Sequence, residues 1–461
     1  MKKTVAKIEF CVKKKEELKE LTYEELLKYV ENLTDNLVVE KPKKDSTNSS
    51  IAPSNDISKP KKNQSLRKKS NRASGAQIGH KGTTLIQSNF IDEIIDTEYS
   101  LDKCKVCHSS LIDEVAQLKE KRQKLDINLN TINTKITQYQ SYSKICSQCG
   151  YDNHDNNFPQ GVTPNISYGQ SIMAIVNYLS VVHYLPYKRI INLLKSLYGV
   201  SLSEGSIDNI IKRVSQLSQD EIKKLTKHLS LSAIVGIDET GCKVDSKKYW
   251  HWTFQDSNTT LIVANPSRGA KVITDTFEEG FINACVVHDN YSSYNALIAK
   301  EEQLCLAHKL RDLNYAIECD DTQVMRDIKQ LLQEAMIDHK EDLTQRQRAI
   351  LKEQYLLMLD RLLETPTIPK SQTQKQLKSF KKARDKIFTF LLNANIPPDN
   401  NASERAIRNI KVKLKVSGQF KSKQGAIDYA NLRSIIDTAR KRGMNEFDAL
   451  HRMLKGESLF E

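Results

Sequence analysis

Two acidic residues, Asp238 and Glu239, directly follow a short apolar run in the segment IVGIDETGCKV at residues 234–244. The β-branched residues of the run predict a buried strand that ends at the carboxylate. A carboxylate in that position is costly to desolvate unless its charge is compensated. A turn cap, a pair with Lys or Arg, or a bound metal ion would each compensate it, and this stretch alone leaves the three explanations open.

The pattern of a strand that ends on an acid occurs a second time. Residues 284–287 predict another strand, and Asp289 follows it. A third acid, Glu404, stands near the start of a helix predicted after the two prolines of IPPDNNASERAIRNIKVKLK. Each has a structural alternative: Asp289 can simply terminate a strand, and Glu404 with Asn401 approximates a capping box.

The elements between these acids predict the fold. Residues 249–256 and 259–266 indicate two strands joined by a turn, residues 268–280 a helix, and residues 304–313 a short fifth strand leading into a helix. Strand, acid, two antiparallel strands, helix, strand, acid and a late helix is the order of a ribonuclease H-like core. The first strand of that core is central and the fourth lies beside it.

In such a core the three acids would converge. Asp238 and Asp289 would lie near one another on neighbouring strands, and Glu404 would approach from the late helix. Carboxylates held together repel unless divalent cations compensate them, and hard Mg²⁺ ions suit oxygen ligands. Two such ions, for which Mn²⁺ can substitute, activate water or a DNA 3′-hydroxyl and stabilise the departing oxygen of an in-line phosphoryl displacement.

Four cysteines form two C-x-x-C pairs, in CKVC at 104–107 and CSQCG at 146–150. Two such pairs complete an all-thiolate tetrahedral zinc site, so we expect a zinc-ribbon-like domain with structural Zn²⁺. The 38 residues between the pairs exceed the usual spacing of about 15–20. Chance clustering of free thiols is the alternative. The expected ligands are Cys104, Cys107, Cys146 and Cys149.

The charge of the 461-residue chain favours an anionic partner. Lys and Arg number 70 against 57 Asp and Glu, and residues 41–82 alone hold eleven Lys and Arg against two Asp. This Ser-, Asn- and Lys-rich segment cannot build a core, and it predicts a flexible linker that contacts DNA or is merely solvated. The sequence has no apolar run of membrane-spanning length and no secretory signal, so we expect a cytoplasmic, nucleoid-associated protein that binds no membrane.

Helical patterns precede the predicted core. Residues 14–38 predict an amphipathic helix, either a coiled-coil element or a helix packed on its own chain. Residues 166–218 predict a helix, a turn with Gly199 and a second helix, which is a helix-turn-helix pattern. Lys212 and Arg213 on the second helix fit DNA contact and fit a solvated face equally well.

The predicted organisation is a multidomain α/β protein with an all-α insertion in its core. Its parts are an N-terminal helix at 1–40, the basic linker at 41–82, the zinc-ribbon-like domain at 83–160, the helix-turn-helix-like region at 161–228, the first part of the core at 229–319, the helical insertion at 320–395 and the last part of the core at 396–461.

Several of these motifs occur together in one known family. GIDETG, VVHDNYSSY, CLAHKLRDL and PPDNNASERAIRNIKVKLKVSGQFKSKQGA, in this order, resemble transposases of the insertion-sequence-66 family of bacterial mobile elements. The resemblance continues upstream through NSSIAPSND, LRKKSNRASGAQIGHKGTTL and both C-x-x-C pairs, and it reaches LRSIIDTARKRG near the C-terminus. It covers nearly the whole chain after about residue 45, although GAQIGH departs from the usual glycine-pair form.

The resemblance implies a DDE transposase, which cleaves at the ends of a mobile element and joins the 3′-hydroxyls to target DNA. Asp238, Asp289 and Glu404 match its catalytic and Mg²⁺-binding acids. Cys305 and His308 match a C-x-x-H element whose role is structural or DNA-positioning, with a buried Cys and a satisfied His as the alternative. The residues matched or similarly placed for DNA contact are Arg405, Arg408, Lys411, Lys413 and Lys415, although a solvated helix face would give the same lysine pattern.

Two other functions fit the same features. One is a transposase-derived DNA-binding protein that no longer cleaves, and the other is a nuclease or resolvase that cuts without joining strands. The presence of all three acids favours the active transposase. Because a transposase must bring two element ends together, we also expect a homodimer or higher multimer on DNA, with accessory proteins of the same element as further partners.

Overall fold

The computed structural model describes residues 168–460 without a gap, two short strands before them, and nine isolated residues (22, 24, 25, 28, 42, 44, 48, 110 and 134). The chain divides into two compact units. Among the described residues of the continuous part, unit 1 contains Cys285–Tyr291 and Glu301–Asn400, and unit 2 contains residues 168–284, Ser292–Lys300 and residues 401–460.

A five-stranded sheet has the strand order β5-β4-β3-β6-β7. The first of these strands, β3, is therefore central and the fourth, β6, is its neighbour, as predicted. The boundary between the two units passes through β6 and β7. The strands are β3 (Ile234–Val244), β4 (Lys247–Gln255), β5 (Thr260–Asn265), β6 (Phe281–His288) and β7 (Ala299–Leu304).

The central strand is longer than expected. We predicted that it would end at Asp238, and this is wrong: Asp238 pairs with Thr253 of β4, and β3 continues to Val244. The hairpin turns at Asp245 and Ser246, whose φ angles of 47° and 62° are both left-handed. Such two-residue turns match the twist of paired strands. Such turns usually contain glycine. The Asp-Ser pair lacks it and therefore gave no recognisable turn signal.

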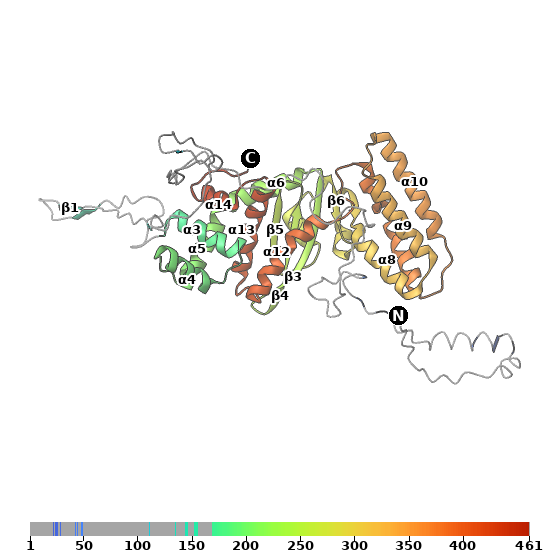
Figure 1. Ribbon diagram of the computed structural model, residues 1–461, viewed down its shortest axis with the longest axis horizontal. Coiled ribbons are helices and arrows are strands. Elements are labelled where there is room, and N and C mark those ends of the chain that lie inside the picture. The colour runs from blue at the N-terminus through green and yellow to red at the C-terminus, as the bar shows by residue number, and fades with distance from the viewer. Residues whose placement is uncertain are drawn as a thin grey trace. The chain divides into compact units, whose positions relative to one another are not determined.

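The two faces of the sheet have different coverings. Side chains alternate between faces along a strand, so Val235 and Ile237 of β3 share one face with Trp252 and Phe254 of β4, and all four are buried. Aromatic rings extend this core, with Phe254 4.9 Å from Phe277 between ring centroids. The opposite face is covered by α12 (Asn401–Ser417), which crosses it in Figure 1.

The free edge of β5 is closed by a helix. Helix α13 (Lys423–Lys441) packs along this strand. The Thr260 N–H donates to the Thr438 hydroxyl at 3.0 Å, and the Ile262 N–H donates to the Ser434 hydroxyl at 2.8 Å. These hydroxyls bond the backbone groups that a further strand would otherwise bond. Helix α13 therefore protects the edge against pairing with another chain.

The first part of unit 2 is helical, as predicted for residues 166–218. Gly199 ends α4 in the left-handed conformation at φ 65°, and the Ser203 side chain accepts the Ser206 N–H at the start of α5. The other helices of unit 2 pack around α13 and the sheet. The helices are α3 (Gln170–Asn177), the π-helix η2 (Tyr178–Val182), α4 (Tyr187–Tyr198), α5 (Glu204–Leu217), α6 (Gln219–Leu231), α7 (Lys271–Thr276), the 3₁₀ helix η3 (Ser292–Ala296) and α14 (Glu446–Leu454).

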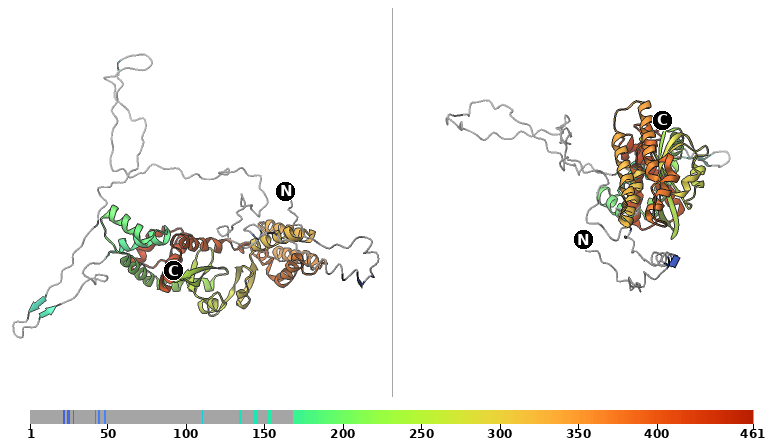
Figure 2. Two further views of the ribbon diagram at one scale, coloured as in Figure 1. Left: turned by 90° about the horizontal axis from the view of Figure 1, so that it is seen from below. Right: turned by 90° about the vertical axis from the view of Figure 1, so that its right-hand side faces the viewer.

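Unit 1 contains a group of helices that lie side by side (Figures 1 and 2). They cover the stretch at 320–392 for which the sequence predicted helices and no strands. The long helices are followed by two 3₁₀ turns. The elements are α8 (Leu306–Asp320), α9 (Gln323–Asp338), α10 (Gln345–Leu363), α11 (Gln372–Ala383), η4 (Arg384–Lys386) and η5 (Thr389–Leu392).

Several predictions fall largely outside the described residues: the helix at 14–38, the linker at 41–82 and the four paired cysteines. Of the predicted helix, Thr22 and Glu25 are described, and they exchange reciprocal capping bonds, from Thr22 N–H to Glu25 at 2.9 Å and back at 3.4 Å. Among the helices that the structure describes, none has the length and apolar character needed to cross a membrane.

Candidate functional site

The two adjacent acids of β3 point to opposite faces of the sheet. Asp238 is half-buried on the face that α12 covers, whereas Glu239 is buried on the aromatic face, opposite Trp252 of β4. Because neighbouring side chains on a strand alternate, the two carboxylates cannot serve one site on the same side. Their environments must therefore be considered separately.

The contacts of Glu239 hold the fold together. The Arg268 guanidinium donates to its Oε1 from Nε at 2.8 Å and from Nη2 at 2.6 Å, and the Tyr294 hydroxyl donates to its Oε2. Arg268 also lies over the Trp250 ring, 4.6 Å from its centroid. Of the explanations that the sequence left open, pairing with Arg thus applies to Glu239. The sequence analysis assigned no role to Arg268, which lies in no family motif, or to Tyr294, although Tyr294 is the last residue of VVHDNYSSY.

Helix α12 runs beside β3 in the same direction. The Lys411 ammonium donates to the Gly241 carbonyl at 3.5 Å, and beyond the helix Phe420 forms a parallel bridge with Val244. The Phe420 N–H donates to the Lys243 carbonyl at 3.0 Å in that bridge. Later residues of the helix segment therefore meet later residues of the strand.

From this direction we expect Glu404 to lie at the level of Asp238 along the strand. Glu404 precedes Lys411 by seven residues, about 10.5 Å of helix rise, and Asp238 precedes Gly241 by three residues, about 10 Å of strand. Glu404 and Lys411 also share one stripe of the helix, because seven residues are close to two full turns. Both acids belong to unit 2 and both are half-buried.

Lys411 supplies a positive charge next to Asp238. Burial lowers the pKa of the Lys411 ammonium, and the charges of Cys242 and Asp238 oppose this shift. The face of the sheet under α12 therefore contains two carboxylates and one cation on adjoining elements.

Asp289 lies in unit 1, directly after β6. Its Oδ1 accepts the Tyr291 N–H at 3.0 Å, which fixes the turn after the strand. The preceding His288 hydrogen-bonds Glu302 at 2.9 Å through Nε2. Burial would raise the pKa of the Glu302 carboxyl, but hydrogen bonds from His288 and Lys386 outweigh burial and hold this pKa below its usual value.

Cys305 connects two segments of unit 1. Its N–H donates to the His288 carbonyl at 2.8 Å, and its thiol accepts the Asn400 N–H at 3.2 Å. The thiol is buried, and it lies within 4.8 Å of a ring nitrogen of His308 in the first turn of α8. Cys305 thus holds the end of β6, next to Asp289, and the residue that precedes α12.

The predicted DNA-contacting residues differ in exposure. Of the five on α12, three are exposed, whereas Lys411 and Lys413 are half-buried. The Lys413 ammonium lies 6.0 Å from the centroid of the Tyr429 ring, and burial lowers its pKa. Lys411 and Lys413 therefore pack on their own chain more than the three exposed residues do. The exposed basic residues from the prediction are Arg405, Arg408 and Lys415 on α12, and Lys212 and Arg213 on α5.

The second C-x-x-C pair has a described frame. Strands β1 (Ser143–Ile145) and β2 (Asp152–His154) pair antiparallel on either side of it, with Ile145 opposite Asp152. Cys146 and Cys149 stand between the two strands in the sequence, outside the described residues.

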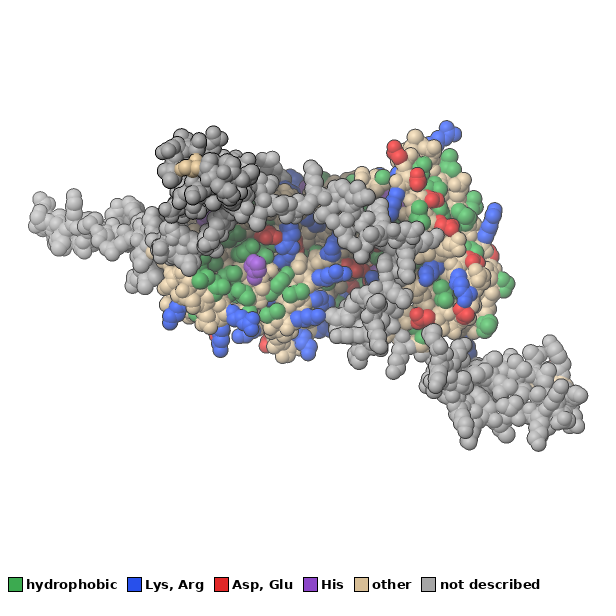
Figure 3. Space-filling model, viewed as in Figure 1, with side chains coloured by type: hydrophobic (Ala, Val, Ile, Leu, Met, Phe, Trp, Pro, Cys, Tyr) green, Lys and Arg blue, Asp and Glu red, His purple; other side chains and the backbone are tan. Residues whose placement is uncertain are grey.

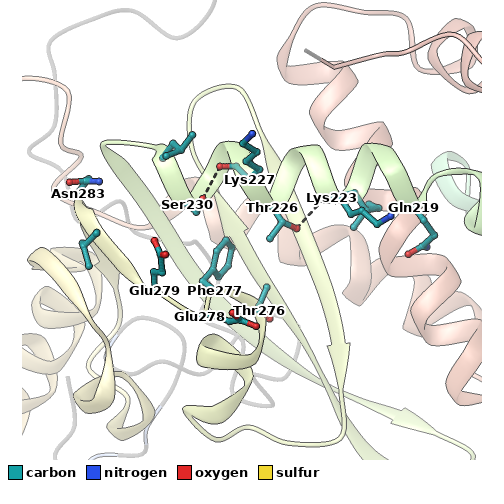
Figure 4. Close-up of a pocket in the computed structure, with 14 residues that line it drawn as sticks. Gln219, Lys223, Thr226, Lys227, Ser230, Thr276, Phe277, Glu278, Glu279 and Asn283 are labelled. Atoms are coloured by element: carbon teal, nitrogen blue, oxygen red, sulfur yellow. Dashed lines mark hydrogen bonds between the residues drawn. The ribbon is translucent and has the colours of Figure 1, made fainter.

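A separate hollow of about 500 Å³ lies between α6 and the turn from α7 to β6 (Figure 4). Lys223 and Lys227 line it from the helix, and Glu278 and Glu279 line it from the turn. None of the three predicted acids lines this hollow, so it is distinct from the face under α12.

Comparison with known proteins agrees with the motifs. Residues 165–428 match the model of the family described as Transposase IS66 family, and residues 10–85 match a family of unknown function, DUF6444. A search of curated proteins found no match. The first match covers more than half of the chain and includes both acids of unit 2 and Asp289. The chain belongs to the IS66 family of transposases.

Proposed function

We propose that this chain is an active DDE transposase. It binds the terminal inverted repeats of a bacterial insertion sequence, cleaves the DNA at the element ends and transfers the 3′-hydroxyl ends to target DNA. Family membership supports the role in transposition. The observation that carries the chemistry is the parallel course of α12 and the central strand, from which we infer that Glu404 lies level with Asp238.

In this proposal Asp238, Asp289 and Glu404 hold the divalent metal ions. The strand order supports the inclusion of Asp289. This residue directly follows β6, and β6 is the neighbour of β3 in the sheet. Cys305 adds a second argument, because it bonds His288, one residue before Asp289, and Asn400, four residues before Glu404. An all-carboxylate donor set fits hard ions such as Mg²⁺ or Mn²⁺.

When bound, two such ions activate the attacking oxygen and stabilise the leaving oxygen of the phosphodiester. The chain's own residues position the substrate. Lys411 lies near Asp238 and can neutralise a phosphate that approaches the site, while Arg405 and Arg408 project from α12 to contact the DNA backbone. The pair of buried Glu239 with half-buried Arg268 keeps β3 in place from the opposite face.

Strand cleavage with Mg²⁺ tests this proposal. We expect Asp289→Asn to abolish cleavage, because a metal-binding carboxylate is lost, whereas Asp275→Asn, an exposed acid of α7, serves as the matched control and retains it. Undiminished cutting by Asp289→Asn would remove this residue from the mechanism. DNA binding without cutting by the parent protein would favour the transposase-derived binding protein, and cutting without joining would favour a nuclease or resolvase.

We further propose that Cys104, Cys107, Cys146 and Cys149 hold a structural zinc ion, and that α4 and α5 act as a helix-turn-helix. The β1–β2 pair supports the first proposal, because a short hairpin commonly carries one C-x-x-C pair of a zinc ribbon. The exposed Lys212 and Arg213 support the second. Metal analysis of the purified protein is expected to find zinc, and a folded zinc-free protein would contradict the assignment.

A further inference from the structure

A group of exposed lysines gathers where the β3–β4 hairpin meets the loop after α12. Figure 3 shows Lys and Arg side chains along α12 and at the end of this hairpin. The segments 243–248 and 415–423 hold six lysines and a single acid, Asp245. We call this surface the basic tip; its lysines are Lys243, Lys247, Lys248, Lys415, Lys421 and Lys423, all exposed.

The basic tip is held in a defined shape. The hairpin turn and the loop after α12 are joined by three hydrogen bonds: Phe420 N–H to the Lys243 carbonyl, Asp245 N–H to the Phe420 carbonyl, and Ser246 N–H to the Gln419 side chain, at 3.0, 2.9 and 2.9 Å. The Phe420 side chain is buried, 5.2 Å from the His251 ring between centroids. Two groups of lysines far apart in the sequence therefore form one ordered surface.

The charges of the basic tip are not compensated within the part of the chain that the structure describes. No ion pair found among those residues involves any of the six lysines. Lys243 and Lys248 are direct cross-strand partners. Like charges directly opposite each other destabilise a hairpin, so this arrangement costs stability in the free protein, and an anionic partner would remove that cost.

We infer that the basic tip binds the phosphate backbone of duplex DNA beside the cleavage site; this inference rests on the proposed function. The tip begins five residues after Asp238 on the same strand, about 17 Å along β3. A duplex strand presents a phosphate about every 3.4 Å. The tip therefore contacts the duplex about five base pairs from the scissile phosphate and sets the angle at which DNA enters the site.

Two matched double substitutions test the inference. Lys243→Gln with Lys248→Gln removes two charges from the tip, and Lys223→Gln with Lys227→Gln removes two charges from the exposed face of α6. Binding to a labelled mixed-sequence duplex is measured against salt concentration. Each lost phosphate contact makes the slope of log K against log salt shallower by about 0.9. The slope of the tip variant should therefore be shallower than that of the parent protein by about 1.8. This corresponds to roughly 60-fold weaker binding at about 0.1 M salt if both proteins bind equally at 1 M.

The α6 variant should keep the parent slope. The melting temperature of the tip variant should equal or exceed that of the parent, because the opposed charges are gone. If the tip variant does not fold, Lys421→Gln with Lys423→Gln, which lie outside the hairpin, is expected to reduce the slope by the same amount. If the folded tip variants keep the salt slope of the parent protein, the inference about the tip is overturned and the proposed function is not. A parent protein that neither binds nor cuts DNA would instead overturn the proposed function.

Discussion

Matched amide substitutions separate the roles of the adjacent acids of β3. Asp238→Asn and Glu239→Gln each remove one negative charge and keep the size of the side chain. Because the two side chains lie on opposite faces of the strand, we expect different defects. Asp238→Asn should abolish strand cleavage and leave stability nearly unchanged, whereas Glu239→Gln should chiefly lower stability.

The size of the stability loss follows from the contacts of Glu239. It accepts two bonds from the Arg268 guanidinium, at 2.8 and 2.6 Å. A hydrogen bond to a charged group contributes about 1.5–3 kcal/mol. The amide still accepts from the charged guanidinium but no longer pairs two opposite charges, so we expect each bond to weaken by about 1 kcal/mol, about 2 kcal/mol in total. For the roughly 190 described residues of unit 2, this lowers the melting temperature by about 4–8 °C.

Thermal unfolding and Mg²⁺-dependent cleavage are measured on the same preparations of both variants. Asp238 is only half-buried, so its substitution should change the unfolding free energy by less than about 1 kcal/mol. Cleavage by Glu239→Gln is measured below its melting temperature and should persist there. A Glu239→Gln protein with parental stability and no cleavage would refute the assignment of the two faces.

Three further predictions concern the surroundings of the site. Burial lowers the pKa of His251 from 6.5 to about 4, so on acidification the unfolded state binds the proton first. The unfolding free energy should therefore fall by about 3 kcal/mol as the pH drops from about 6.5 to 4. His251→Phe should flatten this decline in melting curves recorded across that range, and an unchanged decline would contradict the burial argument. Ser434→Ala with Thr438→Val removes the hydroxyls that close the edge of β5. The double substitution should lower the unfolding free energy by about 2–4 kcal/mol and speed amide hydrogen exchange at Thr260 and Ile262. Unaltered exchange would show that the hydroxyls do not protect the edge. Cys305→Ser keeps an acceptor for the Asn400 N–H and should retain most of the cleavage rate, whereas Cys305→Val should lose it; equal rates would exclude the positioning role.

The predicted order of strands and helices agrees with the structure because each element carries its own periodicity. The β-branched run before Asp238, the two prolines before α12 and Gly199 after α4 are local signals. The end of β3 was missed for the same reason. The strand continues to Val244 because it pairs with β4 through a turn of two left-handed residues, and neither residue is the glycine that usually marks such a turn.

The choice between Asp238 and Glu239 required the fold. In the sequence they are equivalent neighbours after an apolar run, and three explanations fitted either one. Arg268 approaches Glu239 from a segment 29 positions later, and Lys411 approaches Asp238 from a helix more than 170 positions later. Side-chain alternation on β3 then assigns one acid to each face.

The residue types, their order along the chain and the family they indicate could all be read without coordinates, since local periodicity and short motifs are properties of neighbouring residues. The partners of each charged side chain could not. Whether a carboxylate is paired, exposed or next to a lysine depends on contacts between distant segments, and such contacts exist only once the sheet and its covering helices have packed. The basic tip shows this most clearly, because its lysines become one surface through the bridge between Val244 and Phe420.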